Sequence, residues 1–414
     1  MFRVRDDFRR AQVAIAALFC FLGFQYGTWV SRLPALKARL DLSEAELGLL
    51  LMVCGAGAAA SFPLVATLMR RLGSRGLSFV SALCLGLVLP ALALAPNYPV
   101  ALAVVCFDGV AVGCLNVAMN AQGAALEVRY ERTAMSRFHA TFSGGALLAA
   151  LLASGVNTLT PALGVHFGVA AGLLLLLIGF ARPGLLTDGQ KTEEAGEAGQ
   201  EEPKGRRRLT MPSRVTVWMG GAMVFGTVTE GAMNDWSTLY LQDVVHASSG
   251  LAPLGIAVVS VMMVLARVFA DGWRSRWGDG RIVRVGGAVA GAGLALALLV
   301  GGVVPTLIGF ACVGLGMAAA TPCIYVAAAH QGSDALALVA ATGTVGLLAG
   351  PAMIGFIADG SGLVWGMAAV AASAALVSVC ATRIRWRSVA GDKGTPAGDR
   401  AAPASPAEAP ANPA

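Results

Sequence analysis

Charged side chains are scarce in this sequence. Only 13% of its 414 residues are Asp, Glu, Lys or Arg, whereas 56% are hydrophobic. Soluble globular domains carry about 25% charged residues, so most of this chain is not built to cover a water-exposed surface. The formal net charge is +6, but the basic residues lie in short loops between apolar stretches. Membrane topology explains them better than a nucleic-acid partner, and we expect no nucleic acid.

The chain also lacks the patterns that hold metals, disulfides or nucleotides. Its eight cysteines form no Cys-x-x-Cys pair and its four histidines are scattered, so neither a zinc site nor a disulfide framework is indicated. No Walker motif, dinucleotide-binding glycine loop or nucleophile–base pair is visible. We therefore expect no catalytic residue, no metal, no cofactor and no enzyme activity.

Long polar stretches are rare as well, and residues 182–214 form the only one in the interior. This stretch carries six acidic residues followed by a basic cluster, and it has no apolar periodicity. We interpret residues 183–213 as a polar cytoplasmic linker between residues 1–182 and residues 214–382. Residues 383–414 form an Ala/Pro-rich, charged tail that we expect to be disordered and cytoplasmic.

Each of the two apolar parts divides into six stretches that are long enough to cross a bilayer. A helical span needs about 20 mostly apolar residues. The predicted spans are residues 11–31, 46–69, 77–95, 99–122, 134–156, 162–181, 215–240, 251–273, 283–301, 304–328, 335–357 and 361–381. The sequence therefore predicts an all-α membrane protein with twelve transmembrane helices in two six-helix lobes.

Arginine and lysine set the expected orientation in the membrane. With twelve spans both termini lie on one side, and that side receives the arginines of the N-terminus, the linker and most short loops. The opposite side has only Arg32, Lys37 and Arg39. By the positive-inside rule both termini are cytoplasmic. We expect an uncleaved first helix and a multi-pass protein of a bacterial cytoplasmic (inner) membrane.

The loop after the second predicted span and its counterpart in the second half carry related patterns. Residues 70–75 (RRLGSR) match the Arg-x-Gly core of the fingerprint G-x-x-x-D-R-x-G-R-R, although Arg70 occupies the acidic position. In the second half, Arg267 and Asp271 stand four residues apart and lead to a Trp-Gly-Asp sequence at 277–279. Two six-span halves with these loops resemble the major facilitator superfamily. The resemblance implies solute transport, a monomer, and a role for these loops as a cytoplasmic gate.

Three further stretches make the resemblance more specific. They are residues 116–122 together with Glu127, residues 138–145, and residues 230–237. They resemble the YbjJ-like inner-membrane branch of the superfamily, which is distantly similar to sugar permeases of the fucose-permease type. The resemblance covers residues 11–382 and implies transport of a solute that it does not name.

Three polar side chains are expected at one depth in the membrane. At about 1.5 Å per helical residue, Gln25, Asp108 and Glu230 lie in one layer slightly outside the midplane. Inserting an ionisable side chain at this depth costs about 2.5–3.5 kcal/mol on insertion scales, so each such residue is expected to have a structural or functional role. Because burial disfavours the charged form of a carboxyl, Glu230 is the first candidate for proton coupling and Asp108 the second. The alternative is a structural carboxyl held by hydrogen bonds between helices, and we favour such a role for Asp235, with Arg32 as a partner.

Other polar and aromatic residues share helix faces with this layer. Thr227 and Asn234 lie on the same face as Glu230, at spacings i, i+3 and i+7. Amides and an indole suit a hydroxylated solute, so the predicted substrate-binding residues are Gln25, Trp29, Thr227 and Asn234. The alternative for the tryptophans is the aromatic belt at the membrane interface. We favour the belt for Trp236 and leave Trp29 open.

A cytoplasmic gate is expected near the inner ends of the spans. Asn116 and Asn120 share one helix face there, and the expected fold brings Glu127 and Arg71 near them. Together with the loop patterns, the predicted gate residues are Arg71, Gly73, Asn116, Asn120, Glu127, Arg267 and Asp271.

These observations predict a secondary transporter of a small organic solute that works by alternating access and is coupled to protons. Two cargo classes remain open. A polar cargo such as a sugar requires Gln25 and Asn234, whereas a lipophilic drug or metabolite that is exported tolerates the loss of these amides. A third interpretation is a membrane sensor that keeps the fold and moves nothing, which Arg70 favours and the polar layer opposes. The expected partners are the lipid bilayer, the solute and a proton.

Overall fold

The computed structural model describes residues 2–130, 132, 134–187 and 213–386, without the side chains of residues 2–6, 136, 271 and 333. Every regular element within these residues is a helix. The expected linker, residues 183–213, and the expected tail, residues 383–414, fall largely on residues 188–212 and 387–414, which lie outside the described residues.

The helices form two consecutive groups. The first group contains α1 (Phe2–Val30), α2 (Leu33–Leu40), α3 (Glu44–Ala60), α4 (Phe62–Leu94), α5 (Tyr98–Tyr130), α6 (Met135–Leu159), α7 (Leu163–Ala181) and the short 3-10 helix η1 (Arg182–Gly184). The second group contains α9 (Arg214–Leu239), the π-helical turn η2 (Tyr240–Val244), α10 (Leu254–Trp277), α11 (Asp279–Val300), α12 (Val303–Met317), α13 (Ala320–Ala329), α14 (Ser333–Ser361) and α15 (Leu363–Arg383).

Nine helical segments in the described part of the chain are long and apolar enough to cross a membrane. Three predicted spans fall outside this group. α3 has 17 residues, the apolar part of α10 is limited to Leu254–Ala270, and α9 carries two carboxyl groups that lower its hydropathy. The apolar stretches therefore form helices where they are expected, while the count of twelve spans and the cytoplasmic position of both termini remain predictions.

Two predicted spans are not continuous helices. The span at residues 46–69 is divided at Ser61 between α3 and α4, and the span at residues 304–328 is divided at Ala318 between α12 and α13. Conversely, α4 continues from the second predicted span into the third through Gly73, whose φ of 68° is not helical. Gly278, between α10 and α11, has a φ of 77°. Because only glycine adopts such angles at little cost, Gly73 makes the turn after the second predicted span and Gly278 makes the turn after the eighth.

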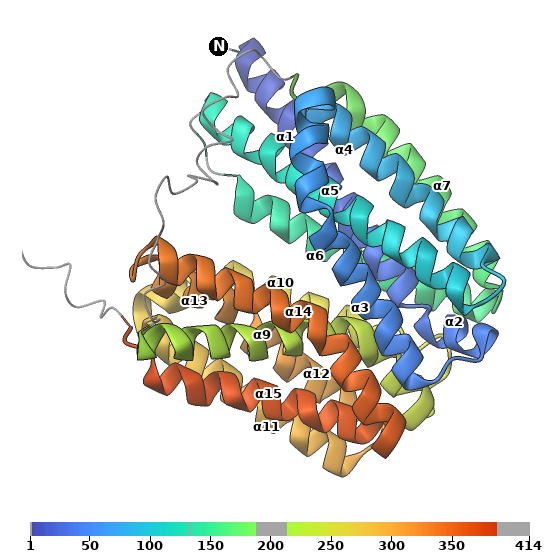
Figure 1. Cartoon of the computed structure of the whole chain (residues 1–414), viewed down its shortest axis with the longest axis vertical. Coiled ribbons are helices and arrows are strands. Elements are labelled where there is room, and N and C mark those ends of the chain that lie inside the picture. Colours follow the sequence, from blue (N-terminus) through green and yellow to red (C-terminus); the bar gives the residue numbers. More distant parts are fainter. Residues whose placement is uncertain (1, 131, 133, 188–212, 387–414) are drawn as a thin grey trace, which may run out of the picture.

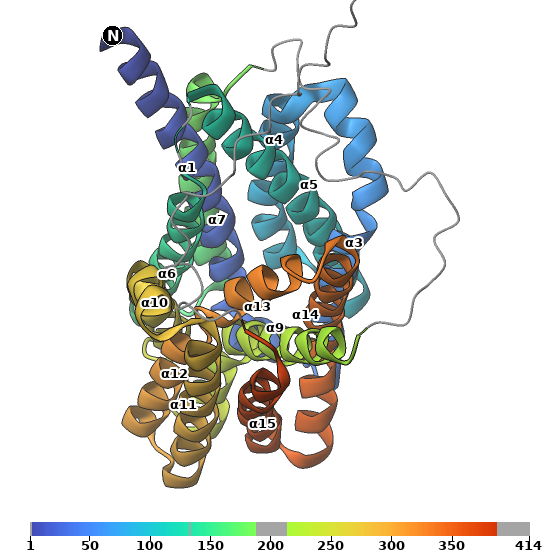
Figure 2. The same ribbon diagram turned by 90° about the vertical axis from the view of Figure 1, so that its left-hand side faces the viewer.

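The two groups of helices form two bundles arranged as a V (Figure 1). The bundles meet at the end that carries α2 and separate toward the end that carries the N-terminus. Contacts between the bundles run mainly through α3 with α14 and α6 with α10, which the turned view shows as neighbouring pairs (Figure 2). The V therefore has a closed end and a wide end.

Two glycines, which have no side chain, permit the close packing of helices at the closed end. A Cβ atom at Gly48 of α3 would lie 2.8 Å from the carbonyl oxygen of Pro351, and one at Gly355 of α14 would lie 2.6 Å from that of Glu44. The backbones of α3 and α14 thus touch, and a larger residue at either glycine would push the bundles apart.

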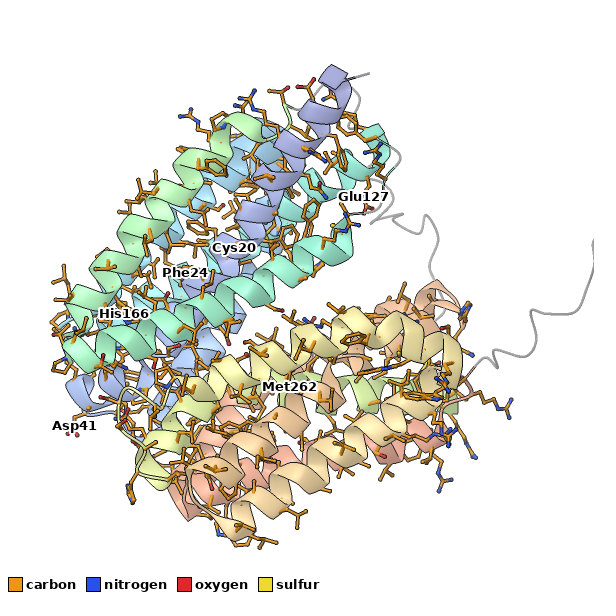
Figure 3. The ribbon with its side chains drawn as sticks, turned by 180° about the vertical axis from the view of Figure 1, so that it is seen from behind. Cys20, Phe24, Asp41, Glu127, His166 and Met262 are labelled. Carbon is orange, nitrogen blue, oxygen red and sulfur yellow. The ribbon has the colours of Figure 1, made fainter. Side chains whose placement is uncertain are left out.

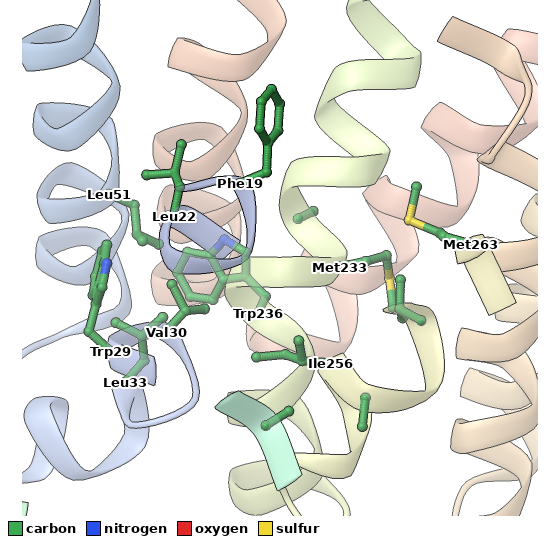
Figure 4. Packing of buried hydrophobic residues seen from close by; sticks show 14 of the residues in the cluster. Phe19, Leu22, Trp29, Val30, Leu33, Leu51, Met233, Trp236, Ile256 and Met263 are labelled. Carbon is green, nitrogen blue, oxygen red and sulfur yellow. The ribbon is translucent and has the colours of Figure 1, made fainter. Parts of the chain in front are cut away.

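A single hydrophobic cluster continues from one bundle into the other at the closed end. Leu22 and Val30 of α1 lie around the indole of Trp236 of α9 (Figure 4). The interpretation of Trp236 as part of an interfacial belt is wrong, because its side chain is fully buried. It occupies the face of α9 that meets the other bundle, whereas a belt residue would face the lipid.

Candidate functional site

Asp108 of α5 is the most deeply buried carboxyl of the first bundle, with 1% of its surface exposed. Its Oδ1 accepts a hydrogen bond of 2.7 Å from Gln25 Nε2 of α1, and the Cys54 thiol of α3 contacts its Oδ2 at 3.6 Å. None of the ion pairs found among the described residues includes it. Burying an unpaired charge is costly, and Gln25 and Cys54 are the two side chains that contact this carboxyl.

A second buried carboxyl lies across the boundary between the bundles. The Tyr26 hydroxyl of α1 donates a hydrogen bond to Oδ1 of Asp235 on α9, whose side chain is 5% exposed. The expected pairing of Asp235 with Arg32 is wrong, because the guanidinium of Arg32 donates to the carbonyl oxygen of Pro161 instead. Consecutive residues of α1, Gln25 and Tyr26, thus hold one carboxyl in each bundle.

Glu230 has a charged partner. Nη2 of Arg267 on α10 lies 3.1 Å from Glu230 Oε1, and Nη1 donates to Ser143 Oγ of α6 at 3.3 Å. The two side chains are 30% and 33% exposed, so the pair borders open space and does not lie in the core. The guanidinium compensates the carboxylate charge and joins α9 and α10 to the first bundle through α6.

Arg267 contacts Glu230 and Ser143, while the expected Arg267–Asp271 pair stays a prediction. The sequence interpretation joins Arg267 to Asp271 near the cytoplasmic end, whereas the structure places the guanidinium on Glu230 and Ser143. The side chain of Asp271 lies outside the described residues. Arg267 stands 13 residues after the start of α10, which is about 20 Å along the helix axis, so it belongs to the polar layer by depth.

The other predicted substrate-binding residues differ in access. Thr227 and Asn234 are half-buried, and each donates to a carbonyl of its own helix at 3.0 Å. Gln25 and Trp29 are buried, with 0% and 1% of their surface exposed. Gln25 Oε1 and Trp29 Nε1 have no hydrogen-bond partner in the described part of the chain. In this structure the side chains of these two residues are closed off from open space.

Of the predicted gate residues, Glu127 lies toward the wide end, where Figure 3 shows it far from Asp41 and His166 at the closed end. Asn120 Nδ2 donates to Asn116 Oδ1 at 2.9 Å. Glu127 accepts from the backbone N–H groups of Ala134 and Met135, and Arg71 is exposed. The structure thus joins the two asparagines to each other, while Glu127 caps the start of α6.

An ion cluster closes the other end. Lys37 Nζ of α2 lies 2.7 Å from Glu44 Oε1 of its own bundle and 3.2 Å from Asp243 Oδ2 of the second bundle. Burial lowers the pKa of Lys37, but the hydrogen bonds and charges of the two carboxylates outweigh it and the net pKa is raised. Burial likewise raises the pKa of Glu44, yet the hydrogen bond and charge of Lys37, together with a hydrogen bond from the backbone of Glu44 itself, outweigh it and the net pKa is lowered. The cluster links the bundles where Lys37 is protonated.

Replacing Lys37 by glutamine is expected to loosen the closed end. Hydrogen–deuterium exchange of α2 and residues 240–244 should rise, and high salt should produce a similar rise in the unmodified chain, because partly exposed ion pairs are screened. The sign with pH follows from the pKa directions. The link to Asp243 is lost as pH rises through the raised pKa of Lys37, above its ordinary 10.5, whereas the Lys37–Glu44 pair within the first bundle is lost as pH falls through the lowered pKa of Glu44, below its ordinary 4.5.

Arg39 supplies the matched control for this experiment. It lies on the same short helix, but its guanidinium donates to the carbonyls of Leu92 and Ala95 within the first bundle. Arg39→Gln should therefore leave exchange at residues 240–244 unchanged. Equal effects of the two variants would show that Lys37 holds α2 in place and does not link the bundles.

Sequence reasoning missed Tyr26, Cys54 and Ser143. These residues contact Asp235, Asp108 and Arg267, respectively. One signal was available for Tyr26, because it is one of only five tyrosines and follows Gln25 within the expected layer. No such signal marks Cys54 or Ser143. In the described part of the chain, no three His, Cys, Asp or Glu side chains lie together in a way that could hold a metal ion.

Comparison with known proteins gives relatives along most of the chain. An uncharacterized transporter of Sinorhizobium fredii, y4wD, is 32% identical over 372 residues, which are 89% of this chain and 96% of that protein. An uncharacterized MFS-type transporter of Yersinia pestis is 31% identical, covering 85% of this chain and 90% of that protein. The membrane protein MosC of Rhizobium meliloti is also 31% identical, covering 84% of each chain.

Solved structures of low sequence identity share the fold. A mutant form of the nucleoside transporter NupG matches with a TM-score of 0.70 at 13% identity, covering 91% of this chain and 99% of that one. The transporter FucP, in its outward conformation, matches with a TM-score of 0.58 at 14% identity, covering 92% and 100%. The family description "Major Facilitator Superfamily" matches residues 13–334. This multi-pass membrane protein therefore belongs to the major facilitator superfamily of transporters.

Proposed function

We propose that the chain is a secondary transporter of a small polar solute in a bacterial cytoplasmic membrane, driven by protons and working by alternating access. The observation that carries the proposal is the buried carboxyl of Asp108, which is held by Gln25 and Cys54 without a cation. Next to it, the Tyr26–Asp235 hydrogen bond crosses the boundary that must open during transport. A change of protonation and a change of access can thus be linked through adjacent residues of α1.

The V-shaped arrangement supports an inward-open state. The positive-inside rule assigns the wide end, with the N-terminus, to the cytoplasm. The closed end is then the outer gate, formed by glycine packing of α3 on α14, the Trp236 cluster and the Lys37 ion cluster. An open cytoplasmic end together with a closed outer end is the arrangement that alternating access requires of an inward-open state.

The surroundings of the two carboxyls favour Asp108 over Glu230 as the proton carrier. Arg267 compensates the charge of Glu230 at 3.1 Å, so a proton on Glu230 would leave that guanidinium unpaired. Asp108 loses no ion pair on protonation. This reverses the order expected from depth alone, and we assign to Glu230 and Arg267 the task of binding polar groups of the cargo.

A polar cargo fits the open part of the site better than a lipophilic one. Glu230, Asn234 and Arg267 are all half-buried and border open space. They provide donors and acceptors for hydroxyl, amide or carboxylate groups. The nucleoside transporter NupG has the same fold, and nucleosides belong with sugars among the solutes to be tested. Export of a lipophilic compound is the second candidate, and it predicts that loss of Asn234 has no effect.

A thermal-shift screen of the purified chain against sugars, nucleosides, organic acids and lipophilic amines tests the proposal. A solute that binds the folded state raises stability by about 2.7 kcal/mol at 100 times its dissociation constant. We expect a polar solute to stabilise the wild type and to lose this effect in Asn234→Ala. Flux of the same solute into proteoliposomes separates transport from sensing. A solute that binds but does not cross the membrane under any gradient would overturn the transporter proposal.

A further inference from the structure

A groove lies at the edge of the second bundle, where α11 is farthest from the first bundle (Figure 1). It has a volume of about 530 Å³ and is lined by α10, α11 and α12. Its apolar walls come from Trp273 and Trp277 of α10, Val285 and Val289 of α11, and Leu315 of α12. The proposed solute site does not extend to these residues, so the groove is a separate feature.

Two glycines form the floor of the groove. A Cβ atom at Gly286 of α11 would lie 2.2 Å from the carbonyl oxygen of Gly316 on α12, and the reverse distance is also 2.2 Å. The two backbones therefore touch where both side chains are missing. Trp273 and Trp277 of α10 form the facing wall and stack at a centroid distance of 6.3 Å, and Phe269 continues the stack beyond the groove at 6.0 Å from Trp273. The groove therefore has a glycine floor and one aromatic wall.

The mouth of the groove is positively charged. Residues 272–284, around the turn between α10 and α11, contain four arginines and one aspartate. That aspartate, Asp279, is held by Arg274 through contacts of 2.8 and 3.1 Å, so its charge is compensated. Arg281 lines the groove and is exposed. No hydrogen bond or ion pair of Arg281 is found within the described residues, so its guanidinium is available to an anion.

We propose that this groove binds one anionic phospholipid, with the headgroup phosphate at Arg281 and an acyl chain between Trp273 and Val289. The turn between two spanning helices lies at the headgroup level, where indoles are also enriched. Basic pockets between helices on the cytoplasmic side bind anionic headgroups. From Arg281 to Val289 the groove follows α11 for about 12 Å, which keeps it within one leaflet of a hydrocarbon layer about 30 Å thick.

The test measures lipid binding by the full chain, so it needs no knowledge of the cargo. Protein in detergent is titrated with phosphatidylglycerol or phosphatidylcholine, and bound lipid is counted by native mass spectrometry. One arginine at an anionic surface contributes about 1 kcal/mol, which corresponds to about fivefold in affinity. We therefore expect Arg281→Gln to weaken phosphatidylglycerol binding about fivefold and to leave phosphatidylcholine binding unchanged. Val285→Trp fills the groove and should weaken both lipids.

Arg137 supplies the charge-matched control. It is exposed near the wide end of the first bundle and does not line the groove. Arg137→Gln should change phosphatidylglycerol affinity less than twofold. Equal losses in the Arg281 and Arg137 variants would overturn the proposal in favour of general surface charge. A dimer of the wild type that Val285→Trp dissociates would overturn it in favour of a second copy of this chain. Unchanged unfolding temperatures in lipid-free detergent show that the variants are folded.

Discussion

Replacing Asp108 by asparagine is expected to abolish solute accumulation driven by a pH gradient, while exchange of solute between the two sides continues. The substitution keeps the volume of the side chain and an oxygen that can accept from Gln25 Nε2, but it removes the proton that is carried. One pH unit is about 1.4 kcal/mol, or tenfold in concentration. With one proton per solute, a gradient of two units supports an accumulation of about 100-fold, and the variant should reach only equal concentrations.

The measurement uses proteoliposomes and a solute found by the thermal-shift screen, with uptake followed under a pH gradient and under equal pH. Asp41→Asn is the matched control, because Asp41 is an exposed acid at the closed end whose φ of 52° asparagine tolerates. It should accumulate solute like the wild type. Full accumulation by the Asp108 variant would show that this carboxyl is structural, and Asp235→Asn would then be the next variant to test.

Sequence reasoning placed residues by depth more reliably than it assigned their partners. Apolar length and a rise of about 1.5 Å per residue put Gln25 and Asp108 at one level, and the structure joins them at 2.7 Å. Partners depend on how each helix is rotated and which helix packs beside it, which a single sequence does not display. For this reason the sequence does not predict the Tyr26–Asp235 hydrogen bond or the contact between Glu230 and Arg267.

Breaks and buried aromatics were harder to predict for a related reason. The divisions at Ser61 and Ala318 lie inside apolar runs that read as continuous spans by hydropathy alone. Each is followed by a proline in the first turn of the next helix, Pro63 or Pro322, and this signal does not enter a hydropathy profile. Trp236 is an aromatic residue near the end of a predicted span, as residues of the interfacial belt are. The face of α9 on which it lies, however, meets the other bundle. Periodicity shows that two residues share a face, and only the fold shows what that face contacts.

The pair formed by Glu230 and Arg267 gives the second large effect. Removing either charge is expected to lower transport at least tenfold and to destabilise the protein, because the remaining group loses its partner. A fully buried pair costs about 3–5 kcal/mol when one partner is removed. Both side chains are about one-third exposed, so solvent screening reduces the expected loss to about 1–2 kcal/mol.

A double-mutant cycle separates pairing from proton transfer. Glu230→Gln and Arg267→Gln should each lower the unfolding temperature, and the double variant should recover a large part of the loss, because neither charge is left alone. Ser143→Ala is the control, since it removes only the 3.3 Å contact to Nη1 and leaves the ion pair. If Glu230 were the proton carrier, Glu230→Gln would instead lose accumulation and keep exchange, as expected for Asp108, and the double variant would recover nothing. Loss of solute binding in Glu230→Gln, with an unchanged pH dependence of the remaining transport, assigns the pair to the cargo and leaves the proton to Asp108.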